Sequence, residues 1–465
     1  MAMARIARLV AESILQAIGG GGPDLVCGNR KSVAETLGPI LRVLGEANDE
    51  ARPSTSASGR LIAARRRNFL GALWHGAFLS LGMSLTQPTT VLSAFIADLT
   101  GSDIWVGGLS TVLAAAGVLP EVLVARWIEP RPRKMPYLML AIYLRVASWG
   151  ILAWLIHAIS TRSPDLLAWV LIGLLALFYA AGGLGGVPYI DIIGKVIPPG
   201  RRGAFFGSRE ALSGILGVGA ALLVRAILAD VIYPENYALL FGLAAAGLAV
   251  ASLGFWVVRE PPRASSHGRP LPWESYWRQL RAAGGRLKAL VVVQLLTGFS
   301  LGALPFYVVF AKRVLGAPAE AVAWYLLAQV SGGVLANVLW AKLVDRVGSR
   351  EMITLCASIS AVTPWIAILS SHRGWEAMVA VFLLAGAFSS GRAVGFRSAL
   401  LEISPPDERP TYSAVNDTLS LPIALVPVLA GLSLQVLSYP QLFALLSIFI
   451  AVGAVLSRRL HDPLD

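Results

Sequence analysis

Seven polar side chains lie deep within long apolar runs of the chain, where their chemistry requires a partner or a cavity. Four are ionisable and three are amides: Glu121, Arg145, Arg225, Arg392, Gln294, Gln329 and Asn337. A charge in apolar surroundings is costly unless it is paired and hydrogen-bonded. Two interpretations are open. Either Glu121 pairs with an arginine between packed helices, or Glu121 carries a proton while Arg145 attracts an anionic group in a central cavity.

The composition indicates which environment these runs occupy. The 465 residues are 56% hydrophobic and 14% charged, and the mean hydropathy is +0.67, whereas soluble domains are about 45–50% apolar. A helix needs roughly 20 mostly apolar residues to cross the hydrocarbon core of a bilayer, and this chain offers many such stretches. We therefore predict an integral membrane protein, with the lipid bilayer as a partner.

Several other classes of protein are disfavoured. The net charge of +12 comes from short Lys and Arg clusters between apolar runs, which is the pattern of membrane topology and not of a nucleic-acid partner. Cys27 and Cys356 are far apart and too few for a disulfide framework or a cysteine metal site. Metal-ligand spacing and a P-loop are absent from the sequence, so we expect no metal, no cofactor and no enzymatic activity.

From about residue 68 the apolar runs divide into twelve predicted membrane spans. They cover 68–97, 104–126, 135–158, 166–190, 207–230, 236–257, 288–311, 319–342, 351–371, 375–400, 411–436 and 439–458. Several exceed the minimum spanning length, which permits tilt. The fold class expected is all-α.

The basic clusters predict the orientation of these spans. Lys and Arg gather in alternate connections, at 65–67, 131–134, 201–209 and 342–350, while 98–103, 231–235 and 437–438 contain none. The main exceptions are Lys312, Arg313 and Arg373. Because positive loops remain on the cytoplasmic side, we expect a multi-pass protein of the plasma (inner) membrane with both termini in the cytoplasm.

Two polar segments lie outside the spans. Residues 1–66 are expected to form a cytosolic extension, with amphipathic helices at 4–18 and 30–47 and a polar linker. Residues 258–287 are expected to form a cytoplasmic linker with a short helix on the membrane surface, because Trp273, Trp277 and Leu280 fall at helical spacing.

The sequence contains an internal repeat. "ARWIEPRPRK" (125–134) aligns with "AKLVDRVGSR" (341–350), and "PPGRRGAFFGSREALS" (198–213) aligns with "PPDERPTYSAVNDTLS" (405–420). The offsets are 341 − 125 = 216 and 405 − 198 = 207 residues. Two pairs at nearly one spacing predict two homologous six-helix bundles, at 67–257 and 288–465, related by parallel duplication.

These features resemble the major facilitator superfamily. Twelve spans as six plus six, cytoplasmic termini and a long middle loop are typical of it, and "DRVGSR" (345–350) is similar to its loop signature D-R-x-G-x-R/K. The first-half copy departs from the signature, with Glu129 for Asp and Pro132 where Gly would stand. The fifth span also lacks the Gly-Pro pair typical of drug/proton antiporters. The resemblance implies two pseudo-symmetric bundles and transport by alternating access.

The same resemblance implies a latch on the cytoplasmic side, with the loop acid of one half facing the start of span five or eleven in the other. Its candidate residues are Glu129, Arg131, Lys134, Asp345, Arg346, Arg350, Arg202, Glu210, Arg409 and Asp417. An acid beside a helix N-terminus is stabilised by the free N–H groups there. The alternative is that these charges mark topology alone and are solvated.

The function expected is therefore secondary active transport of a small organic solute, with a monomer as the expected state. The buried arginines favour an anionic or amphiphilic solute, and Glu121 makes a proton a candidate coupling ion, although uniport fits equally. One alternative is an efflux pump for drugs or hydrophobic compounds. An alternative of another class is a non-transporting membrane receptor or assembly protein that uses residues 1–66.

Overall fold

The computed structural model describes residues 57–128, 131–160, 163–261, 285–404 and 409–460. Helices make up nearly all of these residues, and no strand occurs among them. The helices expected at 4–18 and 30–47 and the surface helix of 258–287 fall outside the described residues. The all-α prediction is confirmed.

The first half of the chain begins with a helix that starts at Ala57, ten residues before the predicted bundle boundary at 67. Its elements are α3 (Ala57–Leu85), a π-helical turn (Pro88–Leu92), α4 (Ser93–Thr100), α5 (Asp103–Ile128), α6 (Met135–Ile159), α7 (Pro164–Val196), α8 (Arg202–Asp230) and α9 (Glu235–Val257). A 3-10 turn, Pro199–Arg201, precedes α8.

The second half repeats this plan with one long merged helix. Its elements are α11 (Gly285–Arg313), α12 (Ala321–Leu369), α13 (Met378–Ile403), α14 (Arg409–Ser420), a 3-10 segment (Leu421–Leu425), α15 (Val426–Ser433) and α16 (Tyr439–Ser457). Short 3-10 turns at Ser370–His372 and Trp375–Ala377 join α12 to α13.

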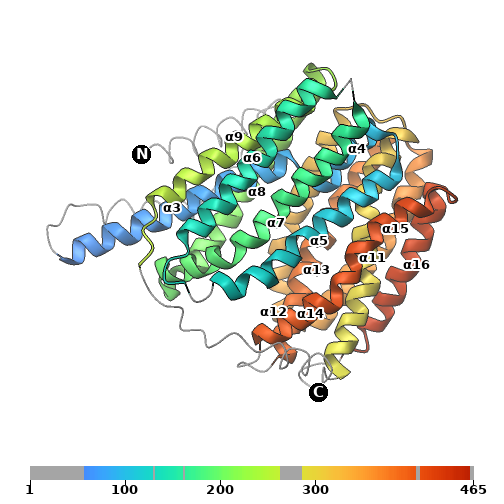
Figure 1. Ribbon diagram of the computed structural model, residues 1–465. Coiled ribbons are helices and arrows are strands. Elements are labelled where there is room, and N and C mark those ends of the chain that lie inside the picture. The colour runs from blue at the N-terminus through green and yellow to red at the C-terminus, as the bar shows by residue number, and fades with distance from the viewer. Residues whose placement is uncertain (1–56, 129–130, 161–162, 262–284, 405–408, 461–465) are drawn as a thin grey trace, which may run out of the picture.

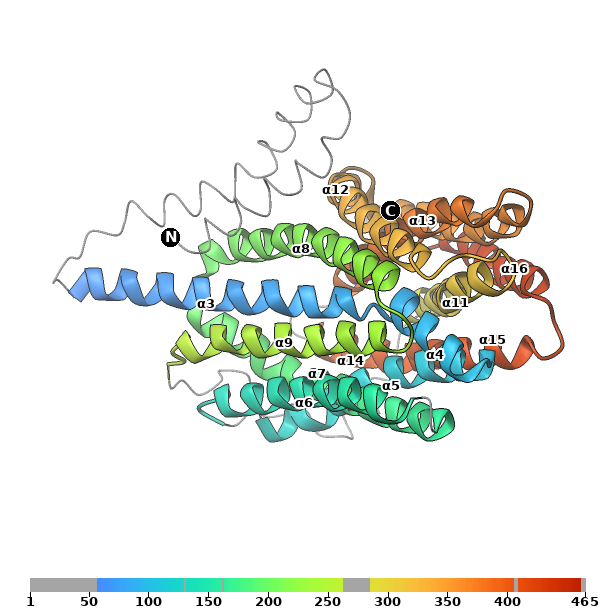
Figure 2. The same cartoon turned by 90° about the horizontal axis from the view of Figure 1, so that it is seen from above.

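By length and composition, eleven helices in the described part of the chain can cross a membrane, and α5 contributes a shorter apolar stretch, Asp103–Gly117. Each of the twelve predicted spans coincides with one of these elements to within several residues. The protein is therefore a multi-pass integral membrane protein. Figures 1 and 2 show the blue-to-green helices grouped on one side and the yellow-to-red helices on the other.

Two pairs of backbone features repeat between the halves. Gly101 ends α4 with φ 66°, and Gly316, after α11, has φ 68°. Both values lie in the left-handed region that favours glycine, as is common just past a helix end. Pro88 interrupts the first span and Pro305 lies inside α11, 305 − 88 = 217 residues later. This spacing agrees with the repeat offset predicted from the sequence.

Gly348 divides α12 into two spans. It lies in the signature "DRVGSR" and has φ 84° and ψ 174°, while the residues on either side remain helical. A residue with a side chain is strained at that φ, because its Cβ meets the following carbonyl. The glycine of the signature therefore provides the turn between the eighth and ninth spans.

The outer faces of the peripheral helices are apolar and exposed, as expected next to lipid. On α6, Leu140, Tyr143, Ile151 and Trp154 are exposed and recur at helical spacing, and Ala147 lies on the same stripe. A helix face of this kind contacts acyl chains in a membrane. Helices inside each half approach closely through glycine instead, and a Cβ added to Gly332 would meet the carbonyl oxygen of Leu383 at 2.0 Å.

Candidate functional site

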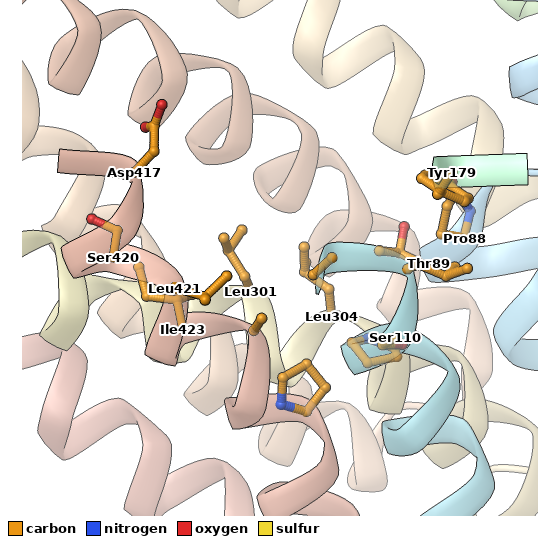
Figure 3. A pocket seen from close by; sticks show the side chains of 15 residues that line it. Pro88, Thr89, Ser110, Tyr179, Leu301, Leu304, Asp417, Ser420, Leu421 and Ile423 are labelled. Carbon is orange, nitrogen blue, oxygen red and sulfur yellow. The ribbon is translucent and has the colours of Figure 1, made fainter. Parts of the chain in front are cut away.

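A cavity of about 420 Å³ lies between the two halves (Figure 3). Its walls come from the first, second, fourth, seventh and eleventh spans: Pro88, Thr89, Ser110, Leu113, Ala114, Tyr179, Leu301, Leu304, Pro305, Asp417, Ser420, Leu421, Ile423, Ala424 and Pro427. A volume of this size is within the range of small-molecule sites, which are roughly 300–1,000 Å³.

Two interrupted helices meet at this cavity. The first span breaks between Leu85 and Pro88, and the eleventh span loses its α-helical geometry from Leu421 to Leu425. Proline explains both breaks, since Pro88, Pro422 and Pro427 lack the N–H that would continue the hydrogen-bond ladder. Irregular backbone at membrane depth is tolerated where it lines a cavity, and discontinuous helices commonly form transporter sites.

Asp417 is the one side chain with a formal charge among the described residues that line the cavity. Figure 3 shows Asp417 and Ser420 at one end, Tyr179 and Thr89 at the other, and leucines between them. Asn416 Nδ2 lies 3.5 Å from Asp417 Oδ1. The sequence had placed Asp417 in a cytoplasmic latch, and the structure places it in the cavity wall.

Arg145 lies behind the cavity wall and not in it. Its Nη2 is 3.2 Å from Met83 Sδ, and its guanidinium lies 4.3 Å from the centre of the Phe178 ring. Its Nε is buried without a hydrogen-bond partner among the described residues. The guanidinium also interacts electrostatically with the neighbouring Tyr179, which does line the cavity.

Arg392 is held within the second half. Its guanidinium hydrogen-bonds Thr297 Oγ1 and, at 2.7 Å, the carbonyl oxygen of Gln294, and it lies 4.7 Å from the Phe396 ring centre. The Gln294 side-chain oxygen is buried without a partner among the described residues. Arg392 thus faces a small gap of about 10 Å³ beside Cys356, away from the main cavity.

The remaining residues that were predicted to bind solute lie in different parts of the structure. Gln329 is buried, and its Oε1 accepts a hydrogen bond from Thr89 Oγ1 at 3.0 Å, so it joins the halves at the cavity edge. Arg225 is exposed and lies 5.0 Å from the Trp324 ring centre. Asn337 is partly buried on α12. The backbone of Glu121 belongs to α5, and its side chain lies outside the described residues.

Ion pairs fasten the two halves at one end of the molecule, which we call the latched end: Asp98, Asp103, Lys312 and Arg313. Lys312 pairs with Asp98, and Arg313 Nη1 lies 2.8 Å from Asp103 Oδ1. Tyr439 donates a second hydrogen bond to Asp103 Oδ1 at 2.7 Å. Each of these contacts joins α4 or α5 of the first half to α11 or α16 of the second half. The contacts therefore hold the two halves together at this end.

Backbone packing closes the latched end further. A Cβ added to Gly107 on α5 would lie 2.2 Å from the carbonyl oxygen of Pro427, and one added to Gly431 would lie 2.5 Å from that of Asp103. By contrast, Ala114 and Asp417, farther from this end, are exposed although they line the cavity. The cavity is therefore accessible from the opposite end, where α14 begins, and is sealed at the latched end.

We call that opposite end the basic end, defined by the connections at 131–134, 197–201 and 345–350. Lys134 is almost fully buried there, and its Nζ lies 3.2 Å from Asp191. Lys195 bonds Asp191 at 2.7 Å and Glu260 at 2.9 Å. Glu260 also accepts hydrogen bonds from the backbone N–H groups of Lys134 and Met135 at the start of α6.

The cross-half latch predicted at the basic end stays a prediction. Arg202 donates to the carbonyls of Gly194 and Ile197, and Arg350 pairs with Glu351 at 2.6 Å. Arg131, Arg346 and Glu210 are exposed. Glu129 and the side chains of Asp345 and Arg409 lie outside the described residues. Lys134, by contrast, belongs to a charge cluster within the first half.

Several residues that join the two halves were missed from the sequence. Lys312 and Arg313 were noted only as exceptions to the positive-inside pattern, and their partners Asp98 and Asp103 were not singled out. The signal was available, because two acids and two cations stand at the same ends of symmetry-related spans. Among the described residues, no group of three or more His, Cys, Asp or Glu is placed to hold a metal ion.

Comparison with known families identifies the second half of the chain directly. The family described as Major Facilitator Superfamily matches residues 290–464. In sequence, the chain is 24% identical over 380 residues to an uncharacterized protein of Mycobacterium tuberculosis (strain ATCC 25618 / H37Rv), covering 78% of this chain and 70% of that one. A protein of Mycobacterium bovis matches to the same extent.

Solved transporters share the fold over most of the chain. A mutant of the nucleoside transporter NupG has a TM-score of 0.68 at 12% identity and covers 85% of this chain and 100% of its own. A bacterial homologue of the iron transporter ferroportin, in an inward-facing state, has a TM-score of 0.63 at 13% identity, covering 86% of this chain and 98% of its own. At these identities the likeness is one of fold.

Proposed function

Because the second half of this chain matches the major facilitator superfamily and the whole has the fold of its transporters, we propose that it is a secondary active transporter of a small organic solute. The two halves rock about the cavity, so that it opens to one side of the membrane at a time. The solute is amphiphilic, and protons are the proposed coupling ion. The plasma (inner) membrane is the proposed location, with both termini in the cytoplasm.

The observation that carries this proposal is a cavity between the halves that is sealed at one end and accessible from the other. Arg313 and Asp103, with Lys312 and Asp98, fasten the latched end, while Asp417 in the wall is exposed. A rocking transporter requires this asymmetry in each of its end states. Since positive loops favour the cytoplasm, the basic end faces inward and the state described is inward-facing.

The solute class follows from the wall. The expectation of an anionic solute rested on Arg145, Arg225 and Arg392. None of these three is among the described residues that line the cavity. The amphiphilic preference is supported instead, because leucine, isoleucine and proline line the cavity together with hydroxyl groups and one carboxylate. The same wall favours the second candidate function, efflux of hydrophobic compounds.

Proton coupling now has two candidate acids. Glu121 was proposed from the sequence, and Asp417 has the advantage of facing the cavity. A carboxylate in an alternating-access site can be protonated from one side and released to the other as its surroundings change. An Asp417→Asn variant is therefore expected to bind solute without responding to an imposed proton gradient.

A flux measurement tests the proposal. Solutes that raise the thermal stability of the purified protein in a metabolite panel are loaded into proteoliposomes under an imposed proton gradient. Ala114→Trp places a large ring in the cavity and should abolish flux, whereas Ala147→Trp lies on the exposed stripe of α6 and should retain it. Circular dichroism of both variants shows whether they are folded. Absence of flux for every solute under any gradient would contradict the proposal.

A further inference from the structure

We infer that the cavity takes a cationic amphiphile: an organic molecule with a protonated amine at one end of an apolar body. This inference rests on the proposed function and assigns the chemical class of the cargo. The inference is based on the charge and the shape of the cavity wall. It reverses the preference for an anionic solute that the arginines suggested in the sequence.

The middle of the cavity is apolar. Leu113, Leu301, Leu304 and Ile423 line it from three different spans, and Figure 3 shows Leu301 and Leu304 between the two polar ends. Burying an apolar body against such a wall is favourable roughly in proportion to the area removed from water. A small, fully polar solute gains nothing from these side chains.

One end of the cavity carries a negative charge. Asp417 accepts a weak hydrogen bond from Asn416 at 3.5 Å and a side-chain hydrogen bond from Ser413, and it interacts electrostatically with Arg397. None of the described lysines, arginines or histidines forms an ion pair with it within 4.0 Å. The carboxylate oxygens are therefore available to accept hydrogen bonds from a ligand ammonium group, which is a strong, charge-assisted interaction.

Arg397 interacts electrostatically with Asp417 from outside the cavity lining, and two deeper arginines are engaged elsewhere. Arg145 contacts Met83 and Phe178 within the first half. Arg392 donates to Thr297 and to the carbonyl of Gln294 within the second half. With all three guanidinium groups outside the lining, the residues of the wall carry one negative charge and no positive charge. An anion would enter this field without a cationic partner in the lining.

The far end supplies neutral hydrogen-bonding groups. The Tyr179 hydroxyl and Thr89 lie across the cavity from Asp417 (Figure 3). A ligand that spans the cavity therefore meets a carboxylate, then leucine side chains, then hydroxyl groups. This order matches an amine on a hydrocarbon body with a small polar or aromatic group at its other end.

Three matched probes test the inference: 4-phenylbutylamine, the neutral 4-phenylbutanol and the anionic 4-phenylbutyrate. Binding to the purified full-length protein is measured by calorimetry for the wild type, Asp417→Asn, Ala114→Trp and the control Asp165→Asn. Asp165 is an exposed acid in the first turn of α7, outside the cavity. The amine should bind about tenfold or more tightly than the alcohol, since a charged hydrogen bond is typically stronger by that factor.

The variants separate the inference from the proposed function. Asp417→Asn should remove the amine's advantage and leave alcohol binding unchanged, Ala114→Trp should abolish both, and Asp165→Asn should change neither. Equal affinity of amine and alcohol for the wild type would overturn the inference. Preferred binding of the butyrate, blocked by Ala114→Trp, would overturn the cationic class while retaining the cavity as the transport site. If no probe binds and solute flux is also absent, both fail.

Discussion

Arg313 on α11 reaches across the boundary between the halves and donates from Nη1 to Asp103 Oδ1 on α5 at 2.8 Å. Its Nη2 donates to the carbonyl oxygen of Ala97 at 3.2 Å. One side chain of the second half therefore binds two elements of the first. Because α5 and α11 also line the cavity, this contact couples closure of the latched end to the site where the solute would bind.

Asp103→Asn is predicted to weaken the latched end. The pair with Arg313 is partly exposed, with side chains 30% and 20% accessible, and pairs of this kind contribute about 0.2–1 kcal/mol. The population with an open latched end should therefore rise roughly 1.4-fold to fivefold. The measurement is the distance distribution between spin labels at Ile232 and Val436, which are 80% and 89% exposed in opposite halves near this end.

A charge exchange provides the control for that prediction. Asp103→Arg alone should widen the label distance, and adding Arg313→Asp should return it toward the wild-type value. Wild-type distances in all of these variants would mean that the ion pair does not hold the end closed.

Gly107→Ala is predicted to oppose closure more strongly. Its Cβ would lie 2.2 Å from the carbonyl oxygen of Pro427, whereas a Cβ on the neighbouring Gly108 has nothing within 4 Å. Forcing a methyl group into a packed contact costs about 1–3 kcal/mol. The label distance should lengthen in Gly107→Ala and remain unchanged in Gly108→Ala. An equal response of the two variants would count against close packing of α5 on α15.

Gly332→Ala tests packing inside one half. The added Cβ would meet the Leu383 carbonyl oxygen at 2.0 Å, while at Gly333 the nearest atom lies at 3.6 Å. We expect Gly332→Ala to lower the thermal unfolding temperature and Gly333→Ala to leave it within error, as followed by differential scanning fluorimetry. Because α12 and α13 move together in a rocking half, the label distance at the latched end should not change in either variant.

Glu260→Gln should destabilise the charge cluster at the basic end. Glu260 is 3% accessible and accepts bonds from Lys195 Nζ and from the first N–H groups of α6. Breaking a buried ion pair by removing one charge typically costs about 3–5 kcal/mol. The unfolding temperature should fall clearly, whereas Glu235→Gln, in an exposed pair with His157, should change it little.

Much of the fold could be predicted because a membrane span is recognisable from its apolar composition alone. Apolar runs of spanning length and alternating basic clusters gave all twelve spans, and two aligned segments gave the duplication. Gly348 is a second example of a structural feature that is visible in the local sequence. The signature "DRVGSR" has a glycine at the position where the backbone takes φ 84°. These features depend on local sequence and on the bilayer, so they needed no knowledge of packing.

The residues of the candidate site were harder to predict from the sequence than the membrane spans. Arg145 was expected near the middle of the membrane, and its contact with Phe178 depends on how α6 and α7 pack. Asp417 was placed near the cytoplasmic boundary by its alignment with Glu210. Asp417 lies one turn before the point where the eleventh span loses its α-helical geometry, and it lines the cavity. Pro422 and Pro427 were the available signal for that break.

Accessibility of a cavity cysteine from each side of the membrane tests the central claim most directly. Ala114→Cys, at an exposed position of the cavity wall and in a Cys27→Ser, Cys356→Ala background, is treated with a membrane-impermeant thiol reagent in oriented vesicles. The account predicts reaction from the basic-end side in the otherwise wild-type protein. With Gly107→Ala added, it predicts reaction from the latched-end side as well. Equal reaction from both sides in the wild type, or an unchanged pattern with Gly107→Ala, would contradict alternating access through this cavity.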